Sequence, residues 1–210
     1  MKRPKSTPVL LLVAVIYLVG AVGLSLEASQ SFFQKLTPLN LLLMIGVLFY
    51  YHQPWDKKHG LAFLLILLAG FFIEVAGVQS GLVFGQYQYG ETLGYQIMGT
   101  PLIIGANWLM LTYMAYHITQ AYQMKFLPQV ITGAFLLLTY DLLLEPVAIQ
   151  LDFWSWGGAG IPLQNYLAWW LIAAIFITFW RSLKIQTSNA VAYGLFIIQL
   201  SFFLILNISL

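Results

Sequence analysis

Three acidic residues in apolar stretches of the sequence have side chains that could do chemistry. Glu74 lies inside an apolar run from Leu61 to Val78, and Asp141 and Glu145 lie in another. A charged group at the depth of the hydrocarbon costs about 2.5–3.5 kcal/mol on insertion scales, so an acid placed there indicates a functional site. The four-residue spacing puts Asp141 and Glu145 on one face of a helix.

Carboxyls that share a poorly hydrated pocket divide the roles of acid and base. One is expected to keep its proton while another ionises. A protonated carboxyl among aromatic rings suits protonation of an apolar alkene, because aromatic faces stabilise the resulting cation. The substrate is expected to be lipid-soluble, since nothing in the region would bind a phosphate or a sugar acid. The residues expected to line the pocket are Tyr87, Tyr89, Asn107, Trp108, Trp154, Trp156 and Asn165.

The composition is that of an integral membrane protein. Of 210 residues, 60% are hydrophobic and 8% are charged, against roughly 25% charged residues in soluble domains. With no cysteine, the chain has no disulfide, thiolate nucleophile or cysteine metal site. No basic cluster is interleaved with aromatic residues, so nucleic-acid binding has no support. We expect one integral membrane domain over residues 1–210.

The apolar runs predict an all-α, polytopic transmembrane bundle. About 20 apolar residues span a bilayer, and gaps of Pro, Gly and charge separate the candidates. The first run is longer than that of a signal peptide, so we expect it to be retained. The predicted spans, about seven in number, cover residues 8–27, 38–51, 60–79, 101–122, 127–149, 162–181 and 189–209.

Positive charge predicts the orientation. With a cytoplasmic N-terminus, every lysine and arginine except Lys35 falls in a cytoplasmic segment, as the positive-inside rule requires. Those residues are Lys2, Arg3, Lys5, Lys57, Lys58, Lys125, Arg181 and Lys184. The C-terminus is then expected outside, and the cytoplasmic (inner) membrane is the expected location.

Segments 80–100 and 150–161 are rich in Gly, Tyr and Trp and contain no lysine or arginine. Two interpretations stay open. The aromatic residues could form an interfacial belt, or the segments could be membrane-embedded caps, which the glycine density favours.

The predicted spans bring polar side chains to one level. At 1.5 Å per residue, Glu74 and Asp141 both lie about 20 Å from the cytoplasmic surface of a core about 30 Å thick. Asn107 enters from the opposite side to the same level, and Asn165 lies just above it. Pro146 is expected to bend its helix near Glu145. An alternative is that these polar residues only pin helices together through hydrogen bonds.

The histidines do not indicate a metal site. His52 and His59 fall in a predicted cytoplasmic turn, His117 is deep in another span, and no HExxH or aspartate-rich motif is present. We expect neither a metal nor any other cofactor.

Four stretches around the acids resemble the carotenoid biosynthesis membrane proteins that include bisanhydrobacterioruberin hydratase and the bacterial carotenoid 1,2-hydratases. They cover residues 74–170, about half of the chain, and read E-V-A-G-V-Q-S-G-L-V-F-G-Q-Y-Q-Y from Glu74, L-G-Y-Q-I-M-G-T-P-L-I-I-G-A-N-W from Leu93, Y-D-L-L-L-E-P-V from Tyr140, and W-S-W-G-G-A-G-I-P-L-Q-N-Y from Trp154. One departure is Glu145, where an aspartate is expected in many relatives. The resemblance implies addition of water across the C1,C2 double bond of an acyclic carotenoid end group, without a redox cofactor. Its implied partners are a lycopene- or gamma-carotene-type substrate, the bilayer and other enzymes of the same pathway.

Three functions are weighed. In hydration, Asp141 or Glu74 protonates C2, and a water held by the other carboxylate with Asn107 or Asn165 attacks the cation at C1. A polyene cyclase would use the same acid but end by proton loss. A carotenoid-binding protein would do no chemistry. A retinal-type photoreceptor is disfavoured because the last span has no lysine, and a transporter because no internal repeat is evident.

Overall fold

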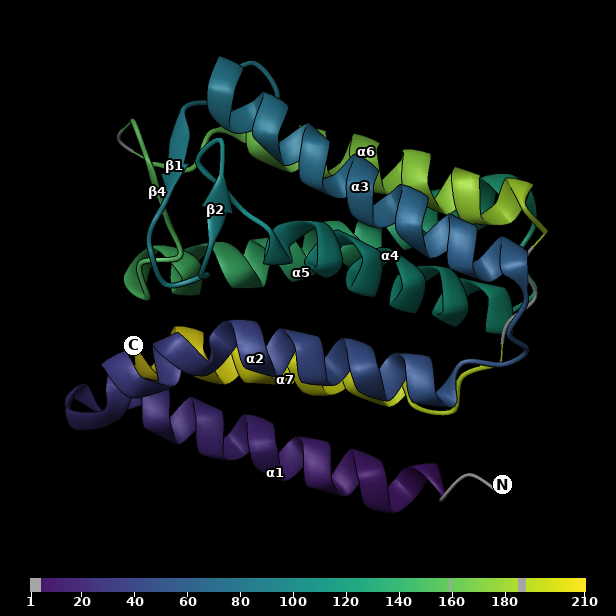
Figure 1. The fold of residues 1–210 in the computed structure, drawn as a ribbon, viewed down its shortest axis with the longest axis horizontal. Coiled ribbons are helices and arrows are strands. Elements are labelled where there is room, and N and C mark those ends of the chain that lie inside the picture. The colour runs from purple at the N-terminus through teal and green to yellow at the C-terminus, as the bar shows by residue number, and fades with distance from the viewer. Residues whose placement is uncertain (1–4, 159, 185–187) are drawn as a thin grey trace.

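Long helices make up most of the protein (Figure 1). A computed structural model describes residues 5–158, 160–184 and 188–210, and within these ranges there are seven α-helices and four short strands. The helices are α1 (Ser6–Ser25), α2 (Glu27–Tyr51), α3 (Lys57–Ser80), α4 (Ile103–Ala121), α5 (Phe126–Gln150), α6 (Leu163–Ser182) and α7 (Ala192–Ser209). The strands are β1 (Tyr87–Tyr89), β2 (Gln96–Ile97), β3 (Thr100–Pro101) and β4 (Trp154–Trp156).

The helices form three layers. Figure 1 shows α3 and α6 on one side, α4 and α5 in the middle, and α1, α2 and α7 on the other side. Helices α5 and α6 pack closely, as do α3 and α4, and α1 and α7. The four helices that carry the acids and their predicted partners, α3 to α6, are therefore neighbours.

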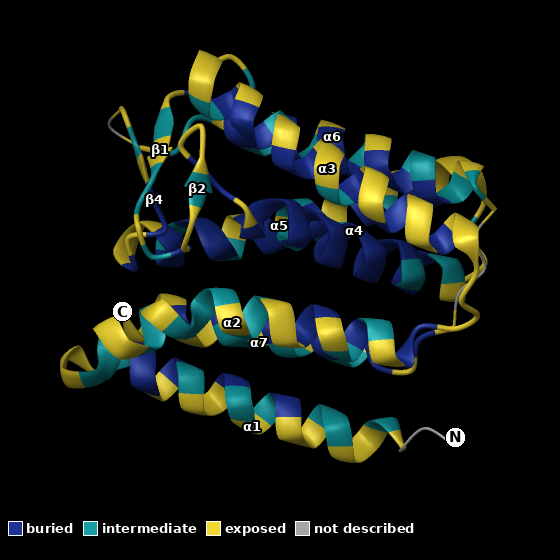
Figure 2. Ribbon diagram, in the orientation of Figure 1, coloured by how far each residue is buried: buried dark blue, intermediate teal, exposed yellow. Residues whose placement is uncertain are grey.

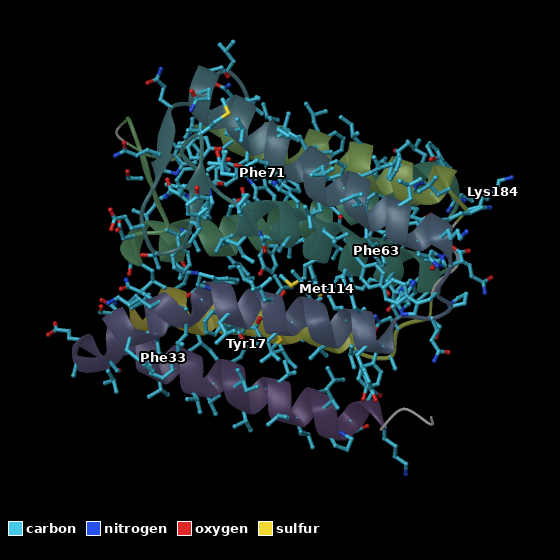
Figure 3. The ribbon with its side chains drawn as sticks, viewed as in Figure 1. Tyr17, Phe33, Phe63, Phe71, Met114 and Lys184 are labelled. Carbon is cyan, nitrogen blue, oxygen red and sulfur yellow. The ribbon has the colours of Figure 1, made fainter. Side chains whose placement is uncertain are left out.

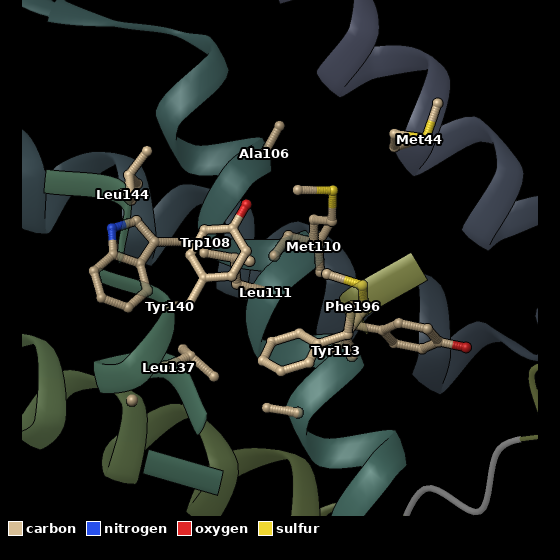
Figure 4. Packing of buried hydrophobic residues seen from close by; sticks show 14 of the residues in the cluster. Met44, Ala106, Trp108, Met110, Leu111, Tyr113, Leu137, Tyr140, Leu144 and Phe196 are labelled. Carbon is tan, nitrogen blue, oxygen red and sulfur yellow. The ribbon is translucent and has the colours of Figure 1, made fainter. Parts of the chain in front are cut away.

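Helix α4 is the centre of the bundle. Fifteen of its 19 residues are buried, and Figure 2 shows buried residues concentrated on α4 and α5. Figure 4 shows the large side chains of α4, among them Trp108 and Tyr113, packed against residues of α5 and α7. Polar threonines fit in this interior because they bond to their own helix; Thr112 Oγ1 donates to the Trp108 carbonyl at 2.7 Å.

The other six described helices are each long and apolar enough to cross a membrane. We conclude that this is a multi-pass helical membrane protein, as predicted from composition. Helix α4 is not among these six, which is consistent with 15 of its 19 residues being buried inside the protein. The exact number of crossings stays a prediction.

Six of the seven predicted spans match helices to within a few residues, but the second was wrong. It was expected to start at Pro38, whereas α2 starts at Glu27 and continues through Pro38. Leu26 alone connects α1 to α2. Polar residues that looked like a loop cap the end of α1 instead: Ser29 Oγ donates to the Gly23 carbonyl at 2.8 Å, and Gln30 Nε2 donates to the Leu24 carbonyl at 3.0 Å.

Apart from Lys35 in the first half of α2, the described basic residues lie at the end of the bundle away from the strands. Lys57 and Lys58 begin α3, Lys125 precedes α5, and Arg181 is near the end of α6. Figure 3 shows Lys184 at this same end. Lys2 and Arg3 lie outside the described residues. This segregation is what the predicted orientation requires, although the orientation itself stays a prediction.

The two segments rich in Gly, Tyr and Trp contribute the strands, which are a small addition to the predicted all-α fold. Strand β1 pairs antiparallel with β4, and β2 pairs antiparallel with β3. Helix α5 continues through Pro146 to Gln150 before the chain enters β4. We call the β1–β4 pair the aromatic ribbon.

Candidate functional site

The aromatic ribbon presents one aromatic face to the helices. Tyr87 pairs with Trp156 and Tyr89 pairs with Trp154. Side chains alternate between the two faces of a strand, so these four rings share one face, while Gln88 and Ser155 between them are exposed. Beyond the strands, the Gly157 and Gly90 amides extend the pairing by donating to the carbonyls of residues 86 and 153 at 2.8 and 3.0 Å.

The β1 side of the ribbon holds Glu74 of α3. The hydroxyls of Tyr87 and Tyr89 donate to Glu74 Oε2 at 2.6 and 2.8 Å, and Trp108 Nε1 of α4 donates to Oε1 at 2.8 Å. Burial raises the pKa of both tyrosine hydroxyls, and the adjacent Glu74 carboxyl raises it further. Both hydroxyls therefore keep their protons and act as donors to a carboxyl that is only 3% exposed.

The β4 side holds Glu145 of α5 in the same manner. Trp154 Nε1 and Trp156 Nε1 donate to Glu145 Oε2 at 3.1 and 2.9 Å. Asn165 of α6 donates from Nδ2 to the other oxygen, Oε1, at 3.1 Å. Each glutamate thus receives three hydrogen bonds, two of them from alternate residues of one strand.

Asp141 accepts fewer hydrogen bonds than either glutamate. The same Asn165 Nδ2 donates to Asp141 Oδ2 at 3.0 Å, so one amide links the two acids that lie a helical turn apart on α5. Asp141 is fully buried, and its Oδ1 has no hydrogen-bond partner among the described residues. A buried polar atom without a partner is uncommon and calls for an explanation.

Glycines allow the close approaches that assemble this site. Gly85 has φ +108°, and a Cβ there would lie 2.7 Å from Pro162 Cγ, just before α6. Gly70 of α3 faces Trp108, where a Cβ would lie 2.6 Å from the Trp108 Cβ. The first glycine lets the chain turn into β1 against α6, and the second lets α3 and α4 approach closely enough for Trp108 to reach Glu74.

Among the described residues, Asn107 makes no side-chain hydrogen bond to the carboxyl cluster of Glu74, Asp141 and Glu145. It is half-buried, and its neighbour Trp108 makes the contact with Glu74. Adjacent residues on a helix point about 100° apart, so Trp108 and Asn107 face different directions at the same depth. Both were predicted to line the pocket, and the role of Asn107 stays a prediction. Asn165 was expected just above the acids and instead contacts two of them directly.

The histidines at the opposite end belong to a separate cluster. Asp56 and His59 form a capping box at the start of α3, and the ring of His59 packs against that of His52. In the described part of the chain, no three His, Asp or Glu side chains gather as a metal site would require.

An apolar cavity lies on the other side of α5 from the acids. Its volume is about 370 Å³, and it is bounded by α1, α2, α5 and α7. Trp108, Trp154 and Trp156 turn their N–H groups to the carboxyls, and their role in substrate binding stays a prediction. Polar side chains of the cavity that the sequence reasoning missed are Tyr17, Asn40, Tyr140 and Gln199; each was detectable only as a polar residue inside an apolar run.

Comparison with known proteins identifies the family. The sequence model described as carotenoid biosynthesis protein matches residues 36–210. The chain belongs to the carotenoid biosynthesis protein family. One relative in this comparison is a bisanhydrobacterioruberin hydratase of Haloarcula japonica, which is 26% identical over 133 residues. The aligned part is 57% of this chain and 44% of that relative, so the chain spans less than half of the relative's length. No solved structure matches the chain.

The family match contains the whole carboxyl cluster. Glu74, Asp141, Glu145 and Asn165 all lie within residues 36–210, as does the aromatic ribbon. Helix α1 lies before the matched range, although it supplies one wall of the apolar cavity. In this member of the carotenoid biosynthesis protein family, the cavity is therefore formed jointly by matched and unmatched sequence.

Proposed function

We propose that the chain is a carotenoid hydratase of the inner membrane that adds water across the C1,C2 double bond of an acyclic carotenoid end group, such as that of lycopene. Membership of the carotenoid biosynthesis protein family supports the substrate class. The name of the Haloarcula japonica relative supports the reaction type. The carboxyl cluster supplies the acid and base that the reaction needs.

The observation that carries the proposal is the unequal hydrogen bonding of the three carboxyls. An ionised carboxylate only accepts hydrogen bonds, whereas a protonated one must also donate. Glu74 and Glu145 each accept three bonds, which suits an ionised group. Asp141 accepts one bond at Oδ2, and its buried Oδ1 has no partner within the part of the chain that the structure describes. We assign the transferable proton to Asp141 Oδ1.

The proposed reaction begins with transfer of that proton to C2 of the substrate. The electron pair of the C1,C2 double bond forms the new C–H bond, which leaves a tertiary cation at C1 and a carboxylate on Asp141. Nearby aromatic faces, among them those of Trp154 and Trp156, can stabilise this cation. General acid catalysis of this kind contributes typically 10²–10⁴-fold to a rate.

Water then completes the addition. Glu145 is the proposed base, because Asn165 ties it to Asp141 and its Oε1 accepts only one bond from the protein. A water oxygen attacks C1 as a proton passes to Glu145, giving a tertiary alcohol. Return of a proton from Glu145 to Asp141 resets the site. Addition of water involves no net oxidation, so no electron acceptor is consumed.

Glu74 has a positioning role in this scheme. Its Oε2 accepts from two tyrosines and its Oε1 from Trp108, so its bonds fasten β1 to α3 and α4. The sequence reasoning left open whether Glu74 or Asp141 is the proton donor, and the hydrogen bonding favours Asp141.

Heavy-oxygen water tests the proposal. Membranes containing the protein are incubated with an acyclic carotenoid in this water, and the pigments are analysed by mass spectrometry. Hydration predicts a product that gains one labelled water for each end that reacts. An unlabelled cyclic isomer would identify a cyclase, and unchanged pigment that co-purifies with the protein would identify a binding protein; either result would overturn the proposal.

A further inference from the structure

The apolar cavity between α1, α2, α5 and α7 opens towards the hydrocarbon of the membrane. Val15 and Val19 of α1, and Leu39 and Leu43 of α2, line it and are also about half or more exposed. Figure 3 shows Tyr17 and Phe33, which line the cavity deeper in, within the layer of α1, α2 and α7. A lipid-soluble chain could therefore enter between α1 and α2 without passing through water.

The floor of the cavity is polar. Gln199 Nε2 of α7 donates to the Tyr17 hydroxyl at 2.7 Å, and the Tyr140 hydroxyl donates to Gln199 Oε1 at 3.4 Å. These three side chains are each at most 6% exposed. A polar network at the bottom of an otherwise apolar slot is typical of sites that fix the polar end of an apolar ligand.

One acceptor in the cavity has no partner. The Asn40 side chain of α2 hydrogen-bonds Tyr17, but its buried Oδ1 receives no hydrogen bond from the described residues. Leaving a buried acceptor unsatisfied is unfavourable. A pure hydrocarbon or an acyl chain would leave that cost in place, whereas a ligand hydroxyl would remove it.

We infer that this cavity binds the hydroxylated end of an acyclic carotenoid, with the tertiary hydroxyl donating to Asn40 Oδ1. The inference rests on the proposed function, since such an alcohol is the proposed product. The volume of about 370 Å³ lies within the 300–1,000 Å³ common for ligand sites. Tyr140 and Asp141 are consecutive on α5, so the cavity is one helix away from the acid that would form the alcohol.

Direct binding of supplied pigment tests the inference. The purified full chain in lipid nanodiscs is mixed with an acyclic carotenoid that carries one tertiary hydroxyl, or with the hydrocarbon of the same chain length. Pigment retained after size exclusion is measured by absorbance. Asn40→Leu removes the acceptor, and Gly20→Leu fills the cavity. Gly20→Ala is the matched control, because a Cβ at Gly20 meets only Phe202 Cε2, at an ordinary 3.7 Å.

The wild-type chain is expected to bind the alcohol about tenfold more tightly than the hydrocarbon, as one satisfied buried acceptor implies. Asn40→Leu should abolish that preference, Gly20→Leu should reduce retention of both pigments, and Gly20→Ala should behave as wild type. Equal binding of alcohol and hydrocarbon by the wild type, or displacement of both by phospholipid, would overturn the inference and make the cavity a lipid groove.

The binding result is independent of the proposed reaction because the alcohol is supplied. Failure of hydration would appear only in the heavy-oxygen assay. If Asn40→Leu does not fold, two results still test the inference: the preference of the wild type for the alcohol over the hydrocarbon, and the comparison of Gly20→Leu with Gly20→Ala.

Discussion

At the scale of single residues, the site is defined by which carboxyl oxygen receives which donor. Two glutamates are enclosed by aromatic N–H and O–H groups, whereas Asp141 has one oxygen without a hydrogen-bond partner among the described residues. Asn165 is the connection, because a single amide nitrogen contacts Asp141 Oδ2 and Glu145 Oε1. It holds the proposed acid and base at a fixed separation and is therefore a positioning residue.

Replacing Asn165 with leucine should slow conversion while the protein still folds. Asn165→Leu keeps the approximate size of the side chain but removes the hydrogen bonds to Asp141 and Glu145. The bond to the ionised Glu145 alone is worth about 1.5–3 kcal/mol. We expect a loss of about 10- to 100-fold in initial rate, measured as alcohol formed per folded protein.

Asn207→Leu is the matched control. Asn207 also donates to α5, at the Leu143 carbonyl at 2.7 Å, but it is exposed and makes no hydrogen bond to the carboxyls among the described residues. Equal losses of rate in the two variants would show that Asn165 contributes only to general packing.

At the scale of elements, side chains that alternate along the two strands attach the aromatic ribbon to the helices. The Y-x-Y and W-x-W patterns each put two hydrogen-bond donors on one face of a strand. The pairing of β1 with β4 then places all four donors on the same face of the ribbon. This explains the two glycine-rich segments as a cap over the acids rather than only an interfacial belt. Loss of one donor should loosen the ribbon before it affects the helices.

Trp156→Phe should therefore increase hydrogen exchange in the ribbon. The variant keeps an aromatic ring and removes the N–H that donates to Glu145 Oε2 at 2.9 Å. Exchange of the amides that pair β1 with β4 should accelerate about tenfold, corresponding to roughly 1.4 kcal/mol, as measured by mass spectrometry.

Trp170→Phe provides the control, because Trp170 Nε1 is buried and has no hydrogen-bond partner in the described ranges. That variant should leave exchange in the ribbon unchanged. If exchange in the ribbon were also unchanged in Trp156→Phe, the Trp156 indole would not be what attaches the ribbon to α5.

At the scale of the whole molecule, apolar run length predicted the helices but not their contacts. Hydropathy located six spans to within a few residues, and failed at α2 because Ser29 and Gln30 cap α1 instead of forming a loop. Depth along a helix could be computed from the sequence, but the direction of a side chain around the helix could not. The contact of Trp108 with Glu74 is therefore known only from the structure.

The pairing of the two strands of the ribbon also could not be predicted from the sequence. Residues 87–89 meet residues 154–156 only because the helices between them return the chain to the same end of the bundle. The period-two patterns Y-x-Y and W-x-W were visible signals of strands, but nothing in them specifies the pairing. The cavity behind α5 likewise depends on four helices that are distant in sequence.

The orientation is testable because the chain has no cysteine. Gln88→Cys places a thiol on the exposed face of the ribbon, and Tyr122→Cys places one at the opposite end, where Tyr122 is 66% exposed. The positive-inside rule predicts that a membrane-impermeant maleimide labels Gln88→Cys on intact cells and Tyr122→Cys only after permeabilisation. The reverse pattern would show that the basic end faces outward.

The central claim is that Asp141 donates the proton that starts water addition, and the heavy-oxygen assay with Asp141→Asn tests it most directly. Asp152→Asn is the matched control, since Asp152 is exposed beyond the end of α5. We predict that wild type and Asp152→Asn form labelled alcohol at similar rates and that Asp141→Asn is slower by at least about 100-fold. Labelled alcohol formed by Asp141→Asn at the wild-type rate would contradict the account.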